Sequence, residues 1–143
     1  MPFNQLVQNL EYPLGQFFTS SSVLTCSADT KVKEVIDLMN KNLVGSIVIT
    51  DNKKPLGIFT ERDVLKKVVG STIIDITTTP IEHLMTKNPV CVTLNTPFTK
   101  IMAAMRLGKF RHLIIVDEHG YLTGIVSIKD VLSRIIDVVN DLK

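Results

Sequence analysis

The stretch that decides the fold reads Gly-Ile-Phe-Thr-Glu-Arg-Asp-Val-Leu over residues 57–65 and returns as Gly-Ile-Val-Ser-Ile-Lys-Asp-Val-Leu over residues 124–132. Each copy has a glycine, two β-prone apolar residues, a hydroxyl residue, and an aspartate three positions after the hydroxyl. The copies start 124 − 57 = 67 residues apart. Such a repeat usually marks one supersecondary unit that cannot bury its apolar face alone and pairs with its twin. A site built on the motif is therefore expected in two related versions.

The repeat extends upstream through a helix and a strand in each copy. The apolar residues of each helix have the i, i+3, i+4, i+7 spacing of one helical face: Val32, Val35, Ile36 and Met39, then Phe98, Ile101, Met102 and Met105. Thr30 and Thr96 are expected to cap these helices, with Pro97 in the first helical position. The β-branched runs at 46–49 and 113–116 predict strands that end at an aspartate turn.

Each copy therefore predicts the order strand, helix, strand, strand, helix. The opening strands are expected at residues 23–25 and 90–92, and a later strand, 56–59 or 123–126, runs directly into the final helix. The final helices carry apolar faces: Val64, Leu65 and Val68, then Val131, Leu132, Ile135, Ile136 and Val139. The fold class is thus α/β (α+β), with a small sheet in each of two repeats related by a pseudo-twofold axis.

Four segments are predicted along the chain. They are an N-terminal arm (1–19), a first repeat (20–70), a linker (71–80), and a second repeat with its C-terminal helix (81–143). The linker has three threonines before a proline and is interpreted as extended. The arm, which includes Leu14, Phe17 and Phe18, does not fit the repeat and is interpreted as a packing arm or a docking surface.

Length and composition predict a globular chain of about one domain. It has 143 residues, of which 45% are hydrophobic. One half alone, of about 60 residues, would bury too little surface, so the halves are expected to pack together. No apolar run approaches the roughly 20 residues that span a bilayer, and the N-terminus lacks the features of a signal peptide. Two cysteines, Cys26 and Cys91, suit a reducing compartment, so the cytoplasm is the expected location.

Charge and motifs argue against nucleic-acid binding and against catalysis. The net charge is +2, and its basic clusters, at residues 53–54, 66–67 and 109–111, form no long basic stripe. The three histidines and two cysteines have no metal-ligand spacing. There is no nucleophile elbow and no Walker motif. The chain is therefore predicted to be no enzyme, with no catalytic residue, no metal and no required cofactor.

The repeated strand-to-helix junction has two interpretations. Thr60 and Ser127 stand where N-caps belong, with Asp63 and Asp130 at the third helical position, which makes a capping device. Alternatively, the junction binds a ligand. A helix N-terminus with a hydroxyl suits a phosphate, and an aspartate one turn away can accept hydrogen bonds from ribose hydroxyls. Glycines at 57 and 124 would then let the backbone approach the ligand closely.

Together these features resemble a tandem pair of cystathionine β-synthase (CBS) domains, a stand-alone Bateman module, over about residues 23–137. The resemblance rests on Gly57-x-x-Thr60-x-x-Asp63, on Gly124-x-x-Ser127-x-x-Asp130, on residues 84–86 and on residues 110–117. It implies an adenosine-ligand sensor that binds AMP, ADP, ATP or S-adenosylmethionine in clefts between the repeats. The aspartates would hold ribose hydroxyls and the motif hydroxyls would contact phosphate. Adenine would lie near Val23 and Thr25, or near Val90 and Val92.

The two copies differ at the start of the middle strand. Arg111 and His112 stand there in the second copy, where the family often contacts phosphates, and the first copy has Gly45 and Ser46. The resemblance therefore predicts that the site of Asp63 uses Arg111 and His112 and favours phosphorylated ligands. The competing interpretation is that Arg111 pairs with a surface carboxylate and that His112 is structural.

Three roles remain for such a module. A sensor would transmit ligand occupancy to a regulated partner protein, a scaffold would use the fold for protein contact without ligand, and a nucleic-acid-associated protein would bind in a salt-dependent way. Both copies keep the ribose aspartate and the hydroxyl, which favours the sensor. The apolar faces of the final helices predict a homodimer; the alternative is that these faces are buried inside the monomer.

Overall fold

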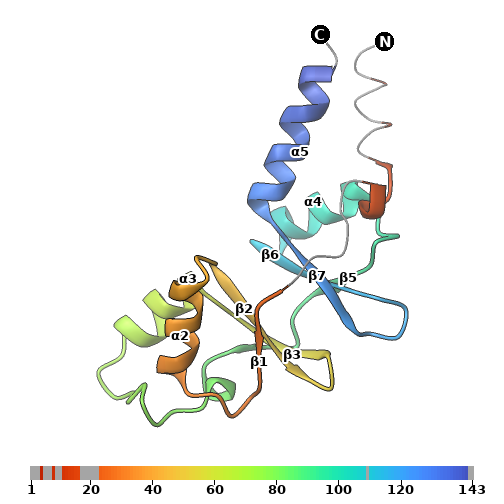
Figure 1. Cartoon of the computed structure of the whole chain (residues 1–143). Coiled ribbons are helices and arrows are strands. Elements are labelled where there is room, and N and C mark those ends of the chain that lie inside the picture. The colour runs from red at the N-terminus through yellow and green to blue at the C-terminus, as the bar shows by residue number, and fades with distance from the viewer. Residues whose placement is uncertain (1–3, 5–7, 9–10, 17–22, 109, 142–143) are drawn as a thin grey trace. The chain divides into compact units, whose positions relative to one another are not determined.

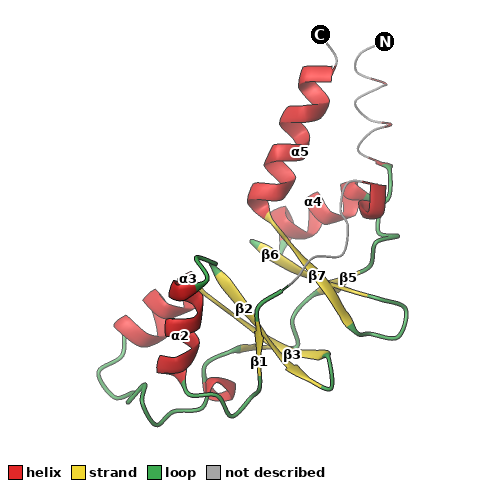
Figure 2. Cartoon of the chain, in the orientation of Figure 1, coloured by secondary structure: helices red, strands yellow, loops and turns green. Residues whose placement is uncertain are grey.

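The computed structural model describes residues 4, 8, 11–16, 23–108 and 110–141. The chain divides into two compact units, one formed by residues 22–89 and the other by residues 1–21 with 90–143 (Figure 1). We call them the first-repeat unit and the second-repeat unit. Each combines a small sheet with helices, as Figure 2 shows.

The first-repeat unit has a four-stranded sheet in the order β1-β2-β3-β4. Strands β1 and β2 are parallel, whereas β3 pairs antiparallel with β2 and with β4. Its elements are β1 (Thr25–Cys26), α2 (Val32–Lys41), β2 (Ser46–Asp51), β3 (Lys54–Thr60), α3 (Glu61–Asp63), the π-helix η2 (Val64–Val69), the 3₁₀-helix η3 (Ile81–His83) and β4 (Thr86–Lys87).

The second-repeat unit has a three-stranded sheet in the order β5-β6-β7, with β5 parallel and β7 antiparallel to β6. Its elements are the 3₁₀-helix η1 (Leu14–Gln16), β5 (Cys91–Val92), α4 (Phe98–Leu107), β6 (His112–Val116), β7 (Leu122–Ser127) and α5 (Ile128–Asp141). Both units therefore have the predicted order of strand, helix, strand, strand, helix, and the predicted fold class is confirmed.

The predicted caps of α2 and α4 are wrong by one residue. The N-caps are Lys31 and Pro97, and neither makes a side-chain cap. The hydroxyl of Thr30 instead lies 3.1 Å from that of Ser27, and the hydroxyl of Thr96 accepts a hydrogen bond from the Thr93 N–H at 3.1 Å. These threonines close the turn before each helix, so they are not free to cap it.

Backbone carbonyls from outside the two helices bind their first N–H groups instead. The Val32 N–H donates to the Thr79 carbonyl, and the Phe98 N–H donates to the Tyr12 carbonyl, each at 3.0 Å. The linker therefore folds onto α2. It also contains a turn in which the Asp75 side chain accepts a hydrogen bond from the Thr77 N–H at 2.9 Å. The expectation of an extended linker is wrong in this part.

Tyr12 belongs to a short segment that repeats the one before the second repeat. Pro13 and Leu14 correspond to Pro80 and Ile81, because 80 − 13 = 81 − 14 = 67. Pro13 bridges Pro97, just as Pro80 bridges Lys31. The segment that precedes the first repeat thus belongs to the second-repeat unit, and the segment that precedes the second repeat belongs to the first-repeat unit. The expectation that the arm does not fit the repeat is wrong for this part; Phe17 and Phe18 lie outside the described residues.

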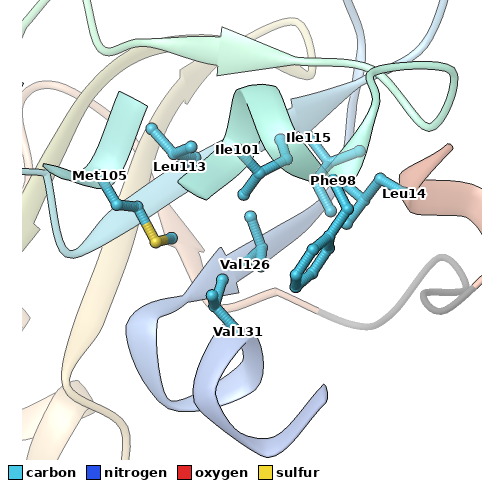
Figure 3. Packing of buried hydrophobic residues seen from close by; sticks show 8 residues of the cluster. All are labelled: Leu14, Phe98, Ile101, Met105, Leu113, Ile115, Val126 and Val131. Carbon is cyan, nitrogen blue, oxygen red and sulfur yellow. The ribbon is translucent and has the colours of Figure 1, made fainter. Parts of the chain in front are cut away.

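The buried apolar residues form one core cluster in each unit. The cluster of the second-repeat unit is drawn in Figure 3, and its members are Leu14, Phe98, Ile101, Met105, Leu113, Ile115, Val126 and Val131. The corresponding cluster of the first-repeat unit consists of Val32, Val35, Met39, Ile47, Ile49, Phe59, Ile81 and Leu84. Leu14 and Ile81 are fully buried. Each core therefore includes a residue from the segment that precedes the other repeat.

Candidate ligand-binding junctions

The first junction is where β3 passes into α3. Asp63 Oδ2 accepts hydrogen bonds from the Thr60 N–H at 2.9 Å and from the Thr60 hydroxyl at 3.2 Å. The Asp63 N–H in turn donates to Thr60 Oγ1 at 3.3 Å, which completes a capping box. The two side chains satisfy backbone donors that the start of a helix leaves unpaired. The motif therefore fixes the aspartate through one carboxylate oxygen.

The second junction, between β7 and α5, repeats this geometry. Asp130 Oδ2 accepts from the Ser127 N–H at 2.8 Å and from the Ser127 hydroxyl at 2.9 Å, and the Asp130 N–H donates to Ser127 Oγ at 3.3 Å. In each junction Oδ1 takes no hydrogen bond from the hydroxyl residue. The capping interpretation of the motif is thus correct, and it leaves a carboxylate oxygen for another donor.

The middle strand contributes a backbone group to each junction. The first helical residue donates its N–H to the carbonyl before that strand: Glu61 to Gly45 at 3.0 Å, and Ile128 to Arg111 at 2.9 Å. Arg111 is exposed, and His112 is half-buried at the start of β6, in register with Ser127. Within the second-repeat unit, the structure thus brings Arg111 and His112 next to the Ser127 junction through the backbone.

Gly57 has a packing role that its sequence position did not reveal. A Cβ atom there would lie 2.5 Å from the sulfur of Met85 and 2.9 Å from the carbonyl oxygen of Thr86. The residue lies in register with Lys87 of the neighbouring strand β4. The glycine therefore gives the Met85–Thr86 segment its place against β3.

The residues expected near adenine lie at the opening strands. Thr25 is exposed in β1, where it is in register with Val48, while Val23 is half-buried just before the strand. Val90 is exposed before β5, and Val92 packs against the core of the second-repeat unit. The residue in register with Ile114, at the place equivalent to Thr25, is Cys91 (91 − 25 = 66). Val90 and Val92, the residues expected from the sequence, flank this exposed cysteine, which the sequence pattern did not indicate.

The two thiols are not activated. Burial raises the pKa of Cys26 to about 11, and partial desolvation of the more exposed Cys91 thiol raises its pKa above the ordinary value as well. A raised pKa keeps a thiol protonated at neutral pH, and the thiolate is the nucleophilic form. Among the described residues, no group of three or more histidine, cysteine, aspartate or glutamate side chains could hold a metal ion. No helix in the same part of the chain is long and apolar enough to cross a membrane.

The duplicated junction has a counterpart among known families. A model of the CBS domain matches residues 14–70 and again residues 81–137. The chain belongs to the CBS domain family. The resemblance to a tandem CBS pair is therefore confirmed, and both matches begin at the equivalent residues Leu14 and Ile81. The segment before each repeat is thus part of the CBS domain itself.

Relatives in sequence support this membership. A 17.7 kDa protein in the bps2 3' region of Acidianus ambivalens is 33% identical over 120 residues, which cover 83% of this chain and 71% of that protein. The CBS domain-containing protein CBSCBSPB1 of Arabidopsis thaliana is 34% identical over 109 residues, 76% of this chain. The match spans only 20% of that longer protein.

Solved structures show the same fold. A conserved protein from Pyrococcus horikoshii has a TM-score of 0.76 at 27% identity and covers 87% of this chain and 92% of its own. The CBS domain protein PAE2072 of Pyrobaculum aerophilum, complexed with AMP, has a TM-score of 0.76 at 23% identity, with 90% and 98% covered. The CBS domain pair of the protein MJ0100, in complex with 5'-methylthioadenosine and S-adenosylmethionine, has a TM-score of 0.73 at 21% identity, with 87% and 95% covered.

Proposed function

We propose that this CBS pair is a regulatory module that binds an adenosine-containing ligand at its two strand-to-helix junctions. The observation that carries the proposal is the geometry of Asp63 and Asp130. In each, Oδ2 is held by the hydroxyl residue, while Oδ1 receives no hydrogen bond from that residue. A carboxylate fixed in this way can accept hydrogen bonds from the two hydroxyls of a ribose with little further ordering.

The phosphate contacts are assigned to Arg111 and His112, together with Thr60 and Ser127. The planar guanidinium of Arg111 suits phosphate oxygens, and His112 can add a donor. The resemblance assigns Arg111 and His112 to the ligand of Asp63. Gly57, Gly124 and the strand residues Val23, Thr25, Val90 and Val92 complete the proposed site, with adenine against the strand residues. Solved proteins of this fold in complex with AMP, and with S-adenosylmethionine and 5'-methylthioadenosine, support this class of ligand.

The proposed module acts by binding and not by catalysis. Ligand occupancy would change the equilibrium between two states of the module by the difference in affinity for them, and a partner protein would read that change. The proposal includes no required cofactor, and the cytoplasm remains the expected compartment because of the cysteine content.

A second copy of the chain is the partner that the exposed surfaces favour. Four exposed apolar residues line one face of α5 at helical spacing: Ile128, Leu132, Ile136 and Val139. Leu65 and Val69, at the places equivalent to Leu132 and Ile136, are exposed as well. Apolar faces of this kind are typical of interaction surfaces. Sedimentation at micromolar concentration should show a dimer that Leu132→Asp with Ile136→Asp dissociates; a monomeric wild type would contradict this part of the proposal.

A thermal-shift panel with AMP, ADP, ATP, S-adenosylmethionine, NAD and GTP tests the binding function. A ligand at about 100 times its Kd adds roughly 2.7 kcal/mol to the free energy of unfolding, which raises Tm by several degrees. We expect a shift that is selective for an adenosyl compound and that Asp63→Ala with Asp130→Ala abolishes. A flat panel at millimolar concentration would support the scaffold, and binding to DNA or RNA that falls steeply with salt would support the nucleic-acid alternative.

A further inference from the structure

Lys67 makes two polar contacts that no part of the repeated motif predicts. Its Nζ donates a hydrogen bond to the Leu84 carbonyl at 2.7 Å and lies 3.4 Å from Asp63 Oδ1 in an ion pair. The side chain of Lys67 is 35% exposed and that of Asp63 is 13% exposed. The Lys67 ammonium therefore approaches the carboxylate oxygen that Thr60 does not bind, the one proposed to receive the ligand.

The other end of this link is a well-packed segment. Leu84 belongs to the core cluster of the first-repeat unit, next to the fully buried Ile81. The N–H groups of Leu84 and Met85 both donate to the Ile81 carbonyl, each at 2.9 Å. The Leu84 carbonyl is thus held in place, and a short charge-assisted hydrogen bond to it anchors Nζ.

The second junction differs at this point. The residue equivalent to Lys67 is Arg134 (134 − 67 = 67), yet none of the ion pairs in the described part of the chain involves Asp130. The two aspartates therefore share the capping box but not the ion pair. The two junctions therefore differ in the ion pair near the start of the helix, in addition to the difference at Arg111 and His112.

We propose that Lys67 is a positioning residue that ties the Asp63 carboxylate to the Ile81–Leu84 segment. This inference rests on the proposed function and extends it to the regulation of one site. Because Nζ is anchored at Leu84, it fixes Oδ1 before a ligand arrives. A ribose hydroxyl that donates to Oδ1 then shares this oxygen with Lys67. Occupancy of the Asp63 junction is thereby coupled to the Ile81–Leu84 segment.

The test compares Lys67→Met with Lys66→Met, since Lys66 is the exposed neighbour on η2, and uses AMP as the probe. Calorimetry in an Asp130→Ala background should show about two- to fivefold weaker AMP binding for Lys67→Met, as expected for loss of a partly exposed ion pair. Lys66→Met should leave the affinity unchanged and Lys67→Arg should restore it. In an Asp63→Ala background, Lys67→Met should have no effect. A loss that persists there would show a general structural role and would overturn the proposal.

Amide hydrogen exchange of residues 81–86 supplies a readout that needs no ligand. Lys67→Met and Asp63→Asn should each speed exchange at Leu84 and Met85, and the double variant should add little more. Exchange that is the same in Lys67→Met as in Lys66→Met would overturn the proposal even if AMP binds. If AMP and the other ligands of the panel do not bind the wild type, the proposed function fails, and this comparison still decides whether Lys67 links Asp63 to the segment.

Discussion

The two junctions use the same hydrogen bonds but lead into different helices. After Asp63 the chain makes a π-helix of six residues, whereas Asp130 lies in an α-helix of 14 residues. The π-helix contains no buried residue, while α5 buries Val131 and Val138. The capping box depends only on residues three positions apart, so it survives both surroundings. The helix that follows depends on what packs against it, so the repeats diverge there.

The two proposed sites are alike in the residues of the repeated motif and differ in the residues around it. The atoms proposed to meet the ribose are fixed by the local motif and are therefore duplicated. The charges around them come from positions outside the motif: Glu61 and Lys67 in one copy stand where Ile128 and Arg134 stand in the other. We therefore expect the same ligand class at both junctions, with different affinities.

The largest expected effect tests the equivalence of the segments before each repeat. Leu14→Ala and Ile81→Ala each remove a fully buried side chain and should each lower the free energy of unfolding by about 2–5 kcal/mol. Urea unfolding, with hydrogen exchange to assign the loss to one unit, measures the effect. Ile73→Ala, at a residue that is 92% exposed, is the control. If Leu14→Ala cost no more than this control, the arm would not be part of the second core.

Next in size is the effect of the aspartates on ligand affinity. Asp63→Ala and Asp130→Ala each remove charged hydrogen bonds worth about 1.5–3 kcal/mol, or about 10- to 100-fold in affinity. Calorimetry with the ligand chosen by the thermal-shift panel measures both variants. Asp37→Ala, on the exposed face of α2, provides the control. Equal losses would remove the expected difference between the junctions, and loss through only one would show that a single site is used.

The Gly57 position should be intolerant of even one added methyl group. Gly57→Ala places Cβ against Met85 and the Thr86 carbonyl and should cost about 1–3 kcal/mol of unfolding free energy, because backbone cannot move aside as a side chain does. Combining it with Met85→Ala removes the contact with the sulfur and leaves the contact with the Thr86 carbonyl, so Gly57→Ala should cost less in that background but still be destabilising. Chemical denaturation of Gly57→Ala, Met85→Ala and the double variant measures these effects, and a neutral Gly57→Ala would contradict this account.

The hairpin turns of the two copies use different residues in the left-handed region of φ. Asn52 and Lys53 have φ of 49° and 66° in the first hairpin, while the second places Gly120 at φ 84°. A lysine in this left-handed region is strained, so Lys53→Gly should stabilise the chain by up to about 1 kcal/mol. Gly120→Ala should destabilise it by about 1 kcal/mol for the same reason. Thermal unfolding of Lys53→Gly and Gly120→Ala measures both effects. The explanation would be refuted if the two substitutions shifted Tm in the same direction.

The smallest effect concerns Asp117, at the turn of the second hairpin. Hydrogen bonds from the Tyr121 and His119 N–H groups hold its pKa below the ordinary 3.8. A lowered pKa in the folded state contributes stability above pH 3.8, which is lost as the pH falls through the folded value. We expect Asp117→Asn to remove this part of the acid sensitivity. The free energy of unfolding is measured against pH for the wild type, for Asp117→Asn and for the control Asp37→Asn. The control should follow the wild-type curve, and an Asp117→Asn curve identical to that of the wild type would contradict this account.

The sequence predicts the features that depend on near neighbours. The order of elements and both capping boxes follow from apolar spacing and from residues three positions apart. Thr30 and Thr96 do not cap the helices as the sequence predicts, because their hydroxyls also fit the preceding turns. The π-helix after Asp63 has no composition signal that distinguishes Val64–Val69 from an α-helix.

The features that sequence reasoning missed depend on distant contacts. The pair Pro13 and Leu14 matches Pro80 and Ile81 in only one identical residue, and its packing partner Phe98 lies 98 − 14 = 84 residues away. The same is true of Lys67, whose bond to the Leu84 carbonyl requires the fold to bring two separate segments together. The 67-residue spacing between Pro13-Leu14 and Pro80-Ile81 is the signal in the sequence that could have indicated the role of Leu14.

The placement of Leu14 also determines the order in which the two cores can form during synthesis. The first-repeat unit ends at Pro89, so all of its core residues have been made when synthesis reaches that point. The core of the second-repeat unit joins Leu14 to Val131, 131 − 14 = 117 positions later. It can close only after the whole first-repeat unit has emerged between its two parts, and long loops close more slowly than short ones. A chain cut at residue 20 would keep every residue proposed to contact the ligand and would lose Leu14, a fully buried residue of one of its two cores.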